Sequence, residues 1–416
     1  MVSVNRLQTM WRTGRRVYRE DGALAAAALV VEKTPFLRRG LRQASLLVSI
    51  EEARSVDWTT SPHFADAPPV PSGTTLNTAW IMSPPGKSSG GHQNIVRFIS
   101  FLEAAGHTAR IYLRSERPKP SELERVRELL AMSSSYSRTV ASVEYYDPAR
   151  GVDGDTHAIF ATGWETAYAA YLDRSRARRF YFVQDFEPMF YPVGSDYLLA
   201  ENTYRFGFHG ITAGRWLAQK LRDDFGMETD YFDFAADQRH YSLTNTGRRD
   251  AIFFYARPVT ARRAFEFGVA VLAEFAAMRP DVQINLAGWD VSTYDLPFEY
   301  VNHSDLDIEQ LNEVYNQCAA GLVLSLTNMS LLPLELMAAG VVPVVNAGDN
   351  NAMVTDNPHI HYVDASPRAI ARELVSLVER EDSAQHAKTI SESVNGLNWQ
   401  HSGTQFVRAL ERAMYE

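Results

Sequence analysis

Glu335 is the carboxylate whose surroundings indicate a binding function most directly. It stands in the first turn of a short helix predicted from Pro333 to Gly340, directly after a polar loop and an apolar run of strand length. Backbone N–H groups at a helix N-terminus lack intrahelical acceptors and attract anions. The N–H groups expected to be free here belong to Ser330, Leu331 and Leu332. N–H groups for phosphates beside a carboxylate for hydroxyls indicate a nucleotide-linked ligand, although a first-turn glutamate also stabilises a helix without any ligand.

Arg257 and Arg262 are the cations expected to complete that anion site. Arg257 follows the predicted strand 251–255, and Arg262 falls in the first turn of a helix predicted over 261–278. A cation at a helix N-terminus opposes the macrodipole, and a bound anion would remove that conflict. The alternative is plain exposure to solvent, which screens the penalty. We expect both arginines to bind an anion at this helix end.

A second set of polar residues follows the predicted strand 180–184. Gln184, Asp185 and Glu187 stand where this strand ends, and the two carboxylates could hold hydroxyl groups or act as a base. The plain alternative is a helix cap and a surface carboxylate. Trp164 follows another predicted strand and could support the apolar face of a sugar or pack in the core.

The loop 83–91 follows the first predicted strand, residues 77–82, and is rich in glycine and serine. Its Gly86–Lys87–Ser88 imitates a phosphate loop, but the Walker pattern needs a glycine where Ile81 stands. The G-x-G-x-x-G pattern is missing as well, so neither an NTPase nor a dinucleotide enzyme is predicted. Gly90 and Gly91 still let a phosphate or a sugar approach the backbone closely.

Other reactive residue types give weaker signals. Asp153 and Asp155 are spaced like a metal-binding D-x-D pair but precede a strand, so a polar turn explains them better. The histidines are scattered without ligand spacing, and we predict no metal site. Cys318 is the one cysteine, falls in an apolar segment, and is expected in the core of a protein from a reducing compartment.

Size and charge set the outer bounds. The 416 residues exceed one core and predict two domains. Residues 1–43 carry a balance of +6, which leaves −15 for the rest of a chain whose net charge is −9. An acidic body does not favour nucleic acid, whereas the basic arm (residues 1–50 at most) could touch an anionic membrane or remain a solvated helix. No apolar run reaches the ~18 residues of a transmembrane helix, so we expect a cytoplasmic location, at the inner face of the membrane if the arm binds it.

The elements that position these residues alternate between strand-like and helical runs from residue 77 to residue 363. This alternation predicts an α/β chain of two doubly wound parallel sheets, with ligands at the C-terminal ends of the strands. The predicted divisions are a helical extension with a linker (1–75), a first domain (76–238), a second domain (239–390) and a terminal helix that packs back on the first domain (391–416).

Together these residues resemble the retaining GT-B glycosyltransferases of the large family four, over roughly residues 77–416. The matching residues are Glu335, Met337, Ala338 and Gly340 in the nucleotide signature, Arg257 and Arg262 at an arginine–lysine pair, and Gly90–Gly91 and Gly106–His107 in the first domain. The first acidic position of the signature falls on Thr327, with Asn328 beside it, at the place that usually contacts the donor sugar. The resemblance implies two Rossmann-like domains facing a cleft, the first for the acceptor and the second for the nucleotide sugar.

Residues 181–191 and 325–335 are similar, more narrowly, to bacterial rhamnosyltransferases that build S-layer or cell-wall glycans and also carry an N-terminal helical extension. That likeness implies a dTDP-β-L-rhamnose donor, no further cofactor, and a lipid-linked or polysaccharide acceptor. The wider resemblance implies retention, with the leaving phosphate taking the acceptor proton and arginines replacing a metal; if the enzyme inverts, Asp185 is the base. Two alternatives stay open: a nucleotide-sugar epimerase of the same fold, and a GT-B scaffold without catalysis.

Overall fold

The computed structural model describes residues 46–415 except 88, 116, 305 and 307. The chain divides into two compact units, 1–49 and 50–416, and the account below concerns the second. The basic arm predicted over residues 1–43 lies outside the described residues. Within the described part, none of the helices combines the length and the apolar character needed to span a bilayer.

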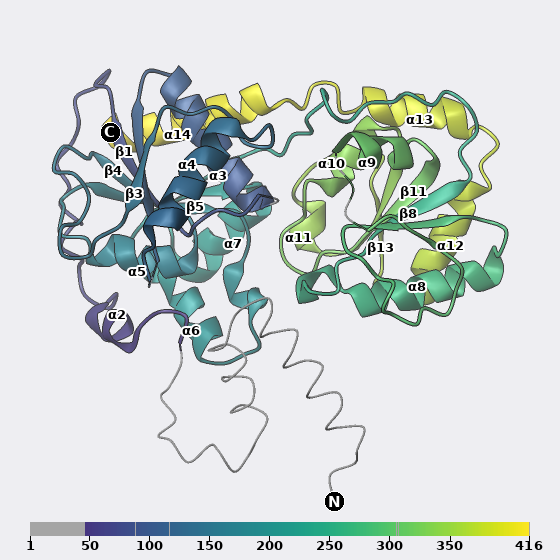
Figure 1. Ribbon diagram of the computed structural model, residues 1–416, viewed down its shortest axis with the longest axis horizontal. Coiled ribbons are helices and arrows are strands. Elements are labelled where there is room, and N and C mark those ends of the chain that lie inside the picture. The colour runs from purple at the N-terminus through teal and green to yellow at the C-terminus, as the bar shows by residue number, and fades with distance from the viewer. Residues whose placement is uncertain (1–45, 88, 116, 305, 307, 416) are drawn as a thin grey trace, which may run out of the picture. The chain divides into compact units, whose positions relative to one another are not determined.

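The first domain is built on a parallel sheet of seven strands in the order β3-β2-β1-β4-β5-β6-β7 (Figure 1). The strands are β1 (Asn77–Met82), β2 (Thr108–Leu113), β3 (Ser142–Tyr145), β4 (Ala158–Ala161), β5 (Arg178–Val183), β6 (His209–Ala213) and β7 (Thr229–Phe232). The helices are α2 (Ile50–Ser55), α3 (Gly90–Ala104), α4 (Pro120–Met132), α5 (Trp164–Leu172), α6 (Ser195–Asn202) and α7 (Arg215–Phe225), with 3₁₀ turns η1 (Glu187–Phe190) and η2 (Thr203–Arg205). The strand order reverses between β1 and β4, so the loops after these strands open at one crevice.

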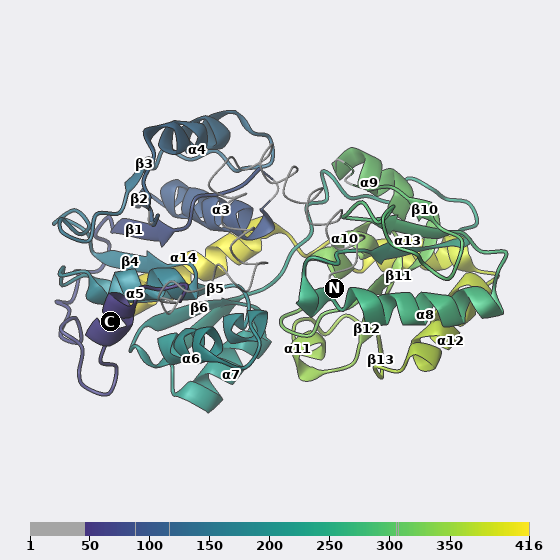
Figure 2. The same ribbon diagram turned by 60° about the horizontal axis from the view of Figure 1, so that its bottom comes forward.

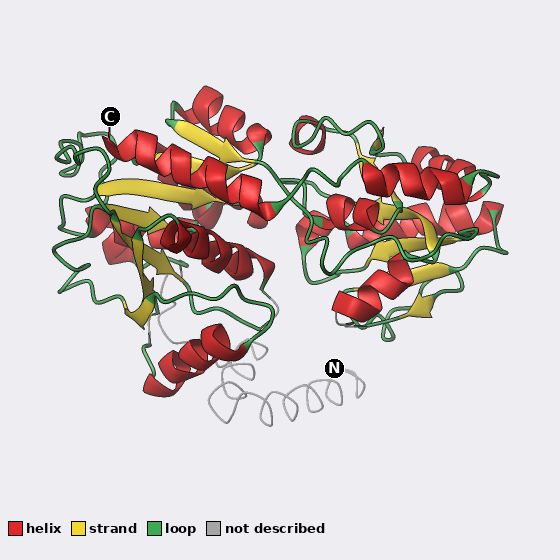
Figure 3. Ribbon diagram, turned by 90° about the horizontal axis from the view of Figure 1, so that it is seen from above, coloured by secondary structure: helices red, strands yellow, loops and turns green. Residues whose placement is uncertain are grey.

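The second domain repeats this scheme with six parallel strands in the order β10-β9-β8-β11-β12-β13. The strands are β8 (Ala251–Tyr255), β9 (Ile284–Ala287), β10 (Val301–Asn302), β11 (Cys318–Val323), β12 (Val342–Asn346) and β13 (His361–Val363). The helices are α8 (Phe265–Met278), α9 (Ile308–Tyr315), α10 (Leu332–Ala338), α11 (Asp349–Ala352), α12 (Pro367–Val378) and α13 (Ser383–Glu392), with the 3₁₀ turn η3 (Ala261–Arg263). In both domains helices cover both faces of the sheet (Figure 3), which is why the central strands are continuous apolar runs.

The C-terminal helix α14 (Trp399–Tyr415) ends the chain but packs in the first domain (Figures 1 and 2). The ring of Phe406 lies 5.1 Å from Phe98, 5.8 Å from Phe160 and 6.0 Å from Trp80, between ring centroids. Trp80 and Phe160 are themselves stacked at 4.2 Å across β1 and β4. This aromatic core holds the two strands whose ends open the crevice.

The helix predicted over 261–278 is wrong at its start. Residues 261–263 form η3 and α8 begins at Phe265, because Ala264 takes a left-handed backbone conformation with φ of 46°. The carbonyl of Arg262 accepts a hydrogen bond from the backbone N–H of Leu326 at 3.1 Å. This carbonyl is therefore bonded to another segment of the chain and not to a residue of α8. Arg262 therefore lies in η3, which is hydrogen-bonded to the loop after β11, and not in the first turn of α8.

Helix α10 is placed by two glycines. A Cβ at Gly321 of β11 would lie 2.6 Å from the end of the Leu336 side chain, so the glycine leaves room for this side chain between helix and strand. Gly340 ends the helix in a left-handed conformation, with φ of 79°, and turns the chain into β12. The close packing fixes Glu335 at the mouth of the crevice.

Candidate active site

One large cavity, of about 1230 Å3, lies between the C-terminal strand ends of the two sheets. Loops after β1, β4, β5 and β6 line it from the first domain, and loops after β8 and β11 line it from the second. The predicted site residues on its wall are Gly90, Gly91, Trp164, Gln184, Asp185, Glu187, Arg257, Arg262, Asn328, Ser330, Leu331, Leu332 and Glu335. Strand ends from both domains therefore bring together residues up to 245 positions apart, from Gly90 to Glu335, as parallel sheets of this kind do.

Three arginines form the cationic side of the cavity. Arg257 extends from the end of β8 and donates a hydrogen bond to the hydroxyl of Tyr255 at 3.1 Å. Arg262 lies 4.1 Å above the ring of Phe190. Arg263 also lines the cavity and donates to the hydroxyl of Ser325 at 2.9 Å, and burial lowers the pKa of its guanidinium.

The polar groups beside these arginines have no hydrogen-bond partner among the described residues. The backbone N–H groups of Ser330, Leu331 and Leu332 and the carboxylate of Glu335 make no hydrogen bond to any described residue. Burial raises the pKa of Glu335 to about 7, and the nearby cation of Arg97 opposes that rise. An anion and a hydroxyl-bearing ligand would satisfy both sets of groups.

Thr327 and Asn328, which the resemblance placed at the donor sugar, are both buried. Thr327 is 1% exposed, does not line the cavity, and its hydroxyl has no partner within the described chain. Asn328 lines the cavity, but its side-chain amide donates hydrogen bonds to the carbonyls of Gln184 at 3.1 Å and Ala213 at 2.9 Å. Asn328 therefore joins the loop after β11 to the first domain.

Asp185 is also part of this junction. One carboxylate oxygen accepts hydrogen bonds from the backbone N–H groups of Asn328 and Phe186, each at 2.9 Å. The other oxygen forms an ion pair with Nε of Arg262 at 3.2 Å. Asp185 thus occupies a backbone N–H and an arginine of the second domain, which are the groups that a phosphate would use.

The glycine loop is held by Gln184. The side-chain amide of Gln184 donates to the carbonyl of Gly91 at 3.1 Å and accepts from Asn94 at 3.3 Å. Gly90 and Gly91 begin α3 and are exposed on the cavity wall. They leave the backbone open to a ligand from that side.

Trp164 is not a sugar platform in this structure. The side chain is 1% exposed, and its ring N–H donates to the hydroxyl of Tyr191 at 2.9 Å. The aromatic surface of the cavity comes instead from Tyr191 and from Phe190, which is 36% exposed. Trp164 supports this surface from beneath.

Glu187 is buried at the same wall. Its carboxylate accepts hydrogen bonds from the backbone N–H of Trp164 at 2.6 Å and the hydroxyl of Tyr181 at 3.1 Å, and so caps α5. Burial, and then the nearby carboxylate of Glu165, raise the pKa of Glu187 to about 8, although both hydrogen bonds oppose the rise. Burial also raises the pKa of Glu165. Glu187 therefore stays largely protonated at neutral pH.

The weaker sequence signals lie elsewhere. Asp153 and Asp155 form ion pairs with Arg110 at 3.3 and 2.8 Å and do not line the cavity. Cys318 is buried, and burial raises the pKa of its thiol to about 12, which confirms a core position. No group of three or more potential metal ligands occurs among the described residues.

Several wall residues were not predicted from the sequence. They are Glu165, Phe190, Tyr191, Tyr241 and Tyr315. Phe190 and Tyr191 follow the strand-end carboxylates by a few positions, a spacing that could have suggested them. Tyr241 and Tyr315 carry no local signal, because they reach the cavity from the interdomain linker and from the end of α9.

Known proteins resemble both halves of the chain. Residues 84–213 match the family described as "WsaF, N-terminal domain", and residues 250–375 match "WsaF, C-terminal domain". Over 248 residues the chain is 32% identical to the O-antigen biosynthesis protein RfbC of Myxococcus xanthus, covering 58% of this chain and 20% of RfbC. The chain thus spans about one fifth of the length of this relative.

Solved structures share the architecture at low identity. The crystal structure of TarM superposes with a TM-score of 0.63 and 8% identity, covering 83% of this chain and 99% of TarM. The pneumococcal O-GlcNAc transferase GtfA, in complex with UDP and GlcNAc, superposes with a TM-score of 0.56 and 9% identity, covering 82% and 100%. The chain has the GT-B fold. The fold predicted from the sequence resemblance is therefore confirmed, and the cavity described above is the interdomain cleft of a GT-B protein.

Proposed function

We propose that this chain transfers a sugar from a nucleoside diphosphate donor to a glycan acceptor during synthesis of a surface polysaccharide. The observation that carries the proposal is a single cavity with arginines and free N–H groups on one wall and aromatic rings and carboxylates on the other. The first wall suits a diphosphate and the second suits a polyhydroxylated acceptor. The WsaF domains, the O-antigen relative and the UDP complex of GtfA support the same class.

The second domain would bind the donor. Arg257 and Arg262 would hold the diphosphate and stabilise the charge that develops as its bond to the anomeric carbon breaks. The N–H groups of residues 330–332 would add donors, and Glu335 would accept hydrogen bonds from the ribose. Because the arginines supply this positive charge, we propose a metal-independent reaction, whose rate a chelator should leave unchanged.

Asp185 would change partners during the reaction. Arg262 cannot hold Asp185 and a phosphate in the same geometry, so the donor diphosphate would displace the carboxylate from Arg262 and from the N–H of Asn328. The displaced carboxylate would face the acceptor side of the cleft. Donor binding before acceptor binding follows from this exchange.

The finer proposals rest on the sequence resemblance. They are dTDP-β-L-rhamnose as the donor, a lipid-linked or polysaccharide acceptor, and retention, in which the acceptor oxygen bonds to the anomeric carbon while its proton passes to the leaving phosphate. Asp185 is the proposed base if the product is inverted. We also propose that the protein works at the cytoplasmic face of the membrane, with residues 1–50 on anionic lipid.

Release of nucleoside diphosphate from a panel of nucleotide sugars tests the function. We expect release from dTDP-β-L-rhamnose, faster with an acceptor glycan, and the anomeric coupling in the product would distinguish retention from inversion. Conversion of one nucleotide sugar into another without release would indicate the epimerase, and binding without either reaction would indicate a scaffold. A protein that neither binds nor turns over any donor would refute the proposal.

Membrane contact has its own experiment. The full chain and a variant lacking residues 1–50 would be sedimented with liposomes that contain anionic lipid. We expect the full chain to sediment more strongly, and less so as salt is raised. Equal sedimentation would remove the arm from the membrane.

A further inference from the structure

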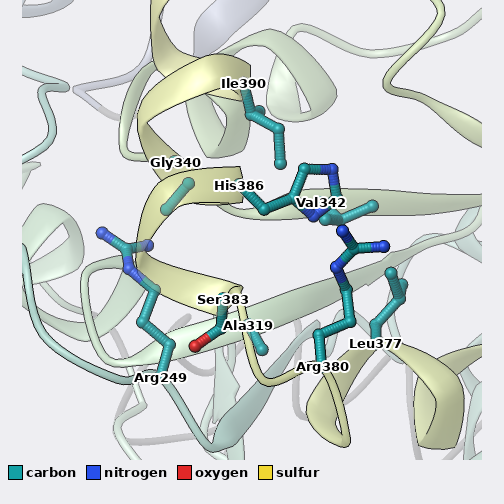
Figure 4. Close-up of a pocket in the computed structure, with 10 residues that line it drawn as sticks. Arg249, Ala319, Gly340, Val342, Leu377, Arg380, Ser383, His386 and Ile390 are labelled. Atoms are coloured by element: carbon teal, nitrogen blue, oxygen red, sulfur yellow. The ribbon is translucent and has the colours of Figure 1, made fainter.

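A small cavity in the second domain contains a buried cation without a counter-ion (Figure 4). The cavity has a volume of about 10 Å3 and shares no lining residue with the interdomain cleft. Its polar lining consists of Arg249, Arg380, Ser383 and His386, and the remainder is apolar or glycine. This volume admits a single guest of about the size of a water molecule.

Arg249 is the buried cation. It precedes β8, is 1% exposed, and donates hydrogen bonds to the carbonyls of Cys318 at 3.4 Å and Asn245 at 3.3 Å and to the side-chain oxygen of Asn316 at 3.0 Å. All three acceptors are neutral, and Nε has no partner. No carboxylate among the described residues is close enough to influence the pKa of Arg249, which burial and Cys318 set. Burial lowers the pKa of Arg249 to about 10, which still leaves it charged at neutral pH.

The other polar groups also present donors. Arg380 pairs with Asp382 at 2.8 Å through one terminal nitrogen, while its buried Nε has no partner. Ser383 and His386 lie in the first turn of the ten-residue helix α13, whose preceding residue makes no side-chain cap. In Figure 4 the two arginines flank Ser383 and His386 from opposite sides. Burial and then the charge of Arg380 lower the pKa of His386, which keeps the imidazole neutral.

We propose that this cavity binds one small monovalent anion of halide size, held by Arg249 at the N-terminus of α13. The anion would balance the charge of Arg249 and accept a hydrogen bond from its unpartnered Nε–H. A phosphate or a sugar carboxylate exceeds the volume, so the site is independent of the proposed donor site and of the proposed function.

Such an anion would stabilise the helix that supports the cleft. Ser391 of α13 donates a hydrogen bond to the carbonyl of Ala338 in α10 at 2.8 Å. The backbone of Ala387 lies beside Gly340 at the end of α10. Because α10 carries Glu335, an anion bound under α13 would make the position of this carboxylate more stable.

Thermal unfolding of the full chain at constant ionic strength tests the site, with chloride replaced stepwise by gluconate, which is too large to enter. We expect a saturable rise in Tm with chloride of roughly 2–4 °C. Arg249→Met should abolish the rise, and Arg248→Met, which changes an exposed neighbour, should retain it. If Arg249→Met does not fold, Ser383→Ala, which removes a hydroxyl from the cavity lining, serves in its place.

Two results would overturn the proposal. Equal Tm in chloride and gluconate would mean that the cavity holds water. A chloride effect that Arg249→Met and Arg248→Met both retain, or both lose, would place the anion elsewhere or make it a general salt effect. Chloride line broadening in NMR, present for the parent and absent for Arg249→Met, would support the site directly.

Discussion

The two walls of the cleft differ in whether their polar groups already have partners. On the wall of the first domain, Glu187 accepts two hydrogen bonds and Asp185 accepts two and pairs with an arginine. On the wall of the second domain, Glu335 and the N–H groups of residues 330–332 have no partner within the described chain. These groups face the cavity and have no partner among the described residues, so this wall is the one open to a charged ligand.

Loss of Arg257 should produce the largest effect. Arg257→Ala removes a guanidinium aimed at the proposed diphosphate, and we expect kcat/KM to fall by about 100-fold or more. Arg248→Ala, an exposed arginine outside the cavity, is the matched control and should leave the rate unchanged. Steady-state release of nucleoside diphosphate measures kcat/KM for both variants. A wild-type rate for Arg257→Ala would mean that the cationic wall of the second domain does not contribute to catalysis.

Glu335→Ala should have the next largest effect and would sharpen the assignment to the ribose. Donor affinity should fall by about tenfold, because the hydrogen bonds to the carboxyl group of Glu335 are lost. The loss should be larger for UDP than for dTDP, since ribose offers two hydroxyls where deoxyribose offers one. Calorimetric titration of both nucleotides into both proteins gives the comparison. Equal losses would show that Glu335 does not bind the sugar of the nucleotide.

Asp185 lies where the two walls meet, and its two possible roles predict opposite changes in the affinity for dTDP. If the carboxylate competes with the diphosphate for Arg262, Asp185→Asn should bind dTDP more tightly, by about 3–10-fold, while sugar transfer slows. Glu165→Gln removes a carboxylate from the same wall that touches neither Arg262 nor Asn328, and it should leave dTDP affinity near that of the parent. Weaker binding by Asp185→Asn would mean that Asp185 assists the donor.

The sequence located the strand ends well. Buried parallel strands are apolar runs, and the predicted boundaries of β1 (Asn77–Met82) and β8 (Ala251–Tyr255) agree with the structure at every residue. The polar residues that follow these and other strands consequently line one cavity, as Gly91, Gln184 and Arg257 do. Position along the chain was enough to assign these residues to the cleft.

Contacts between distant residues could not be predicted in this way. Asp185 and Asn328 are 143 positions apart, and their hydrogen bond depends on how the two sheets face each other. Trp164 was a candidate platform because it follows a strand, but its orientation depends on Glu187 and Tyr191, which belong to another loop. Arg262 left the predicted helix because Leu326 binds its carbonyl. Each difference arises from a tertiary hydrogen bond that no local pattern encodes.

Glu187 gives the smallest effect and tests whether this carboxyl group keeps its proton in the folded chain. Its pKa of about 8 in the folded chain lies above its ordinary value of 4.5. Between these values the folded protein keeps a proton that the unfolded chain has lost. The free energy of unfolding should therefore fall as the pH rises through this range and level off above it.

Glu187→Gln keeps an oxygen that can accept the N–H of Trp164 but cannot ionise. Its free energy of unfolding should fall less between about pH 5 and about pH 8.5 than that of the parent, by roughly 1–3 kcal/mol. Urea unfolding of both proteins at the two pH values measures the difference. Glu335, whose pKa is raised to about 7, contributes equally to the free energy of unfolding of both proteins, so its contribution cancels in the difference. Parallel pH profiles would mean that Glu187 ionises in the folded chain as freely as in the unfolded one. Glu187 would then add a second negative charge beside Asp185 on the wall of the first domain, and this charge would repel the diphosphate proposed for the opposite wall.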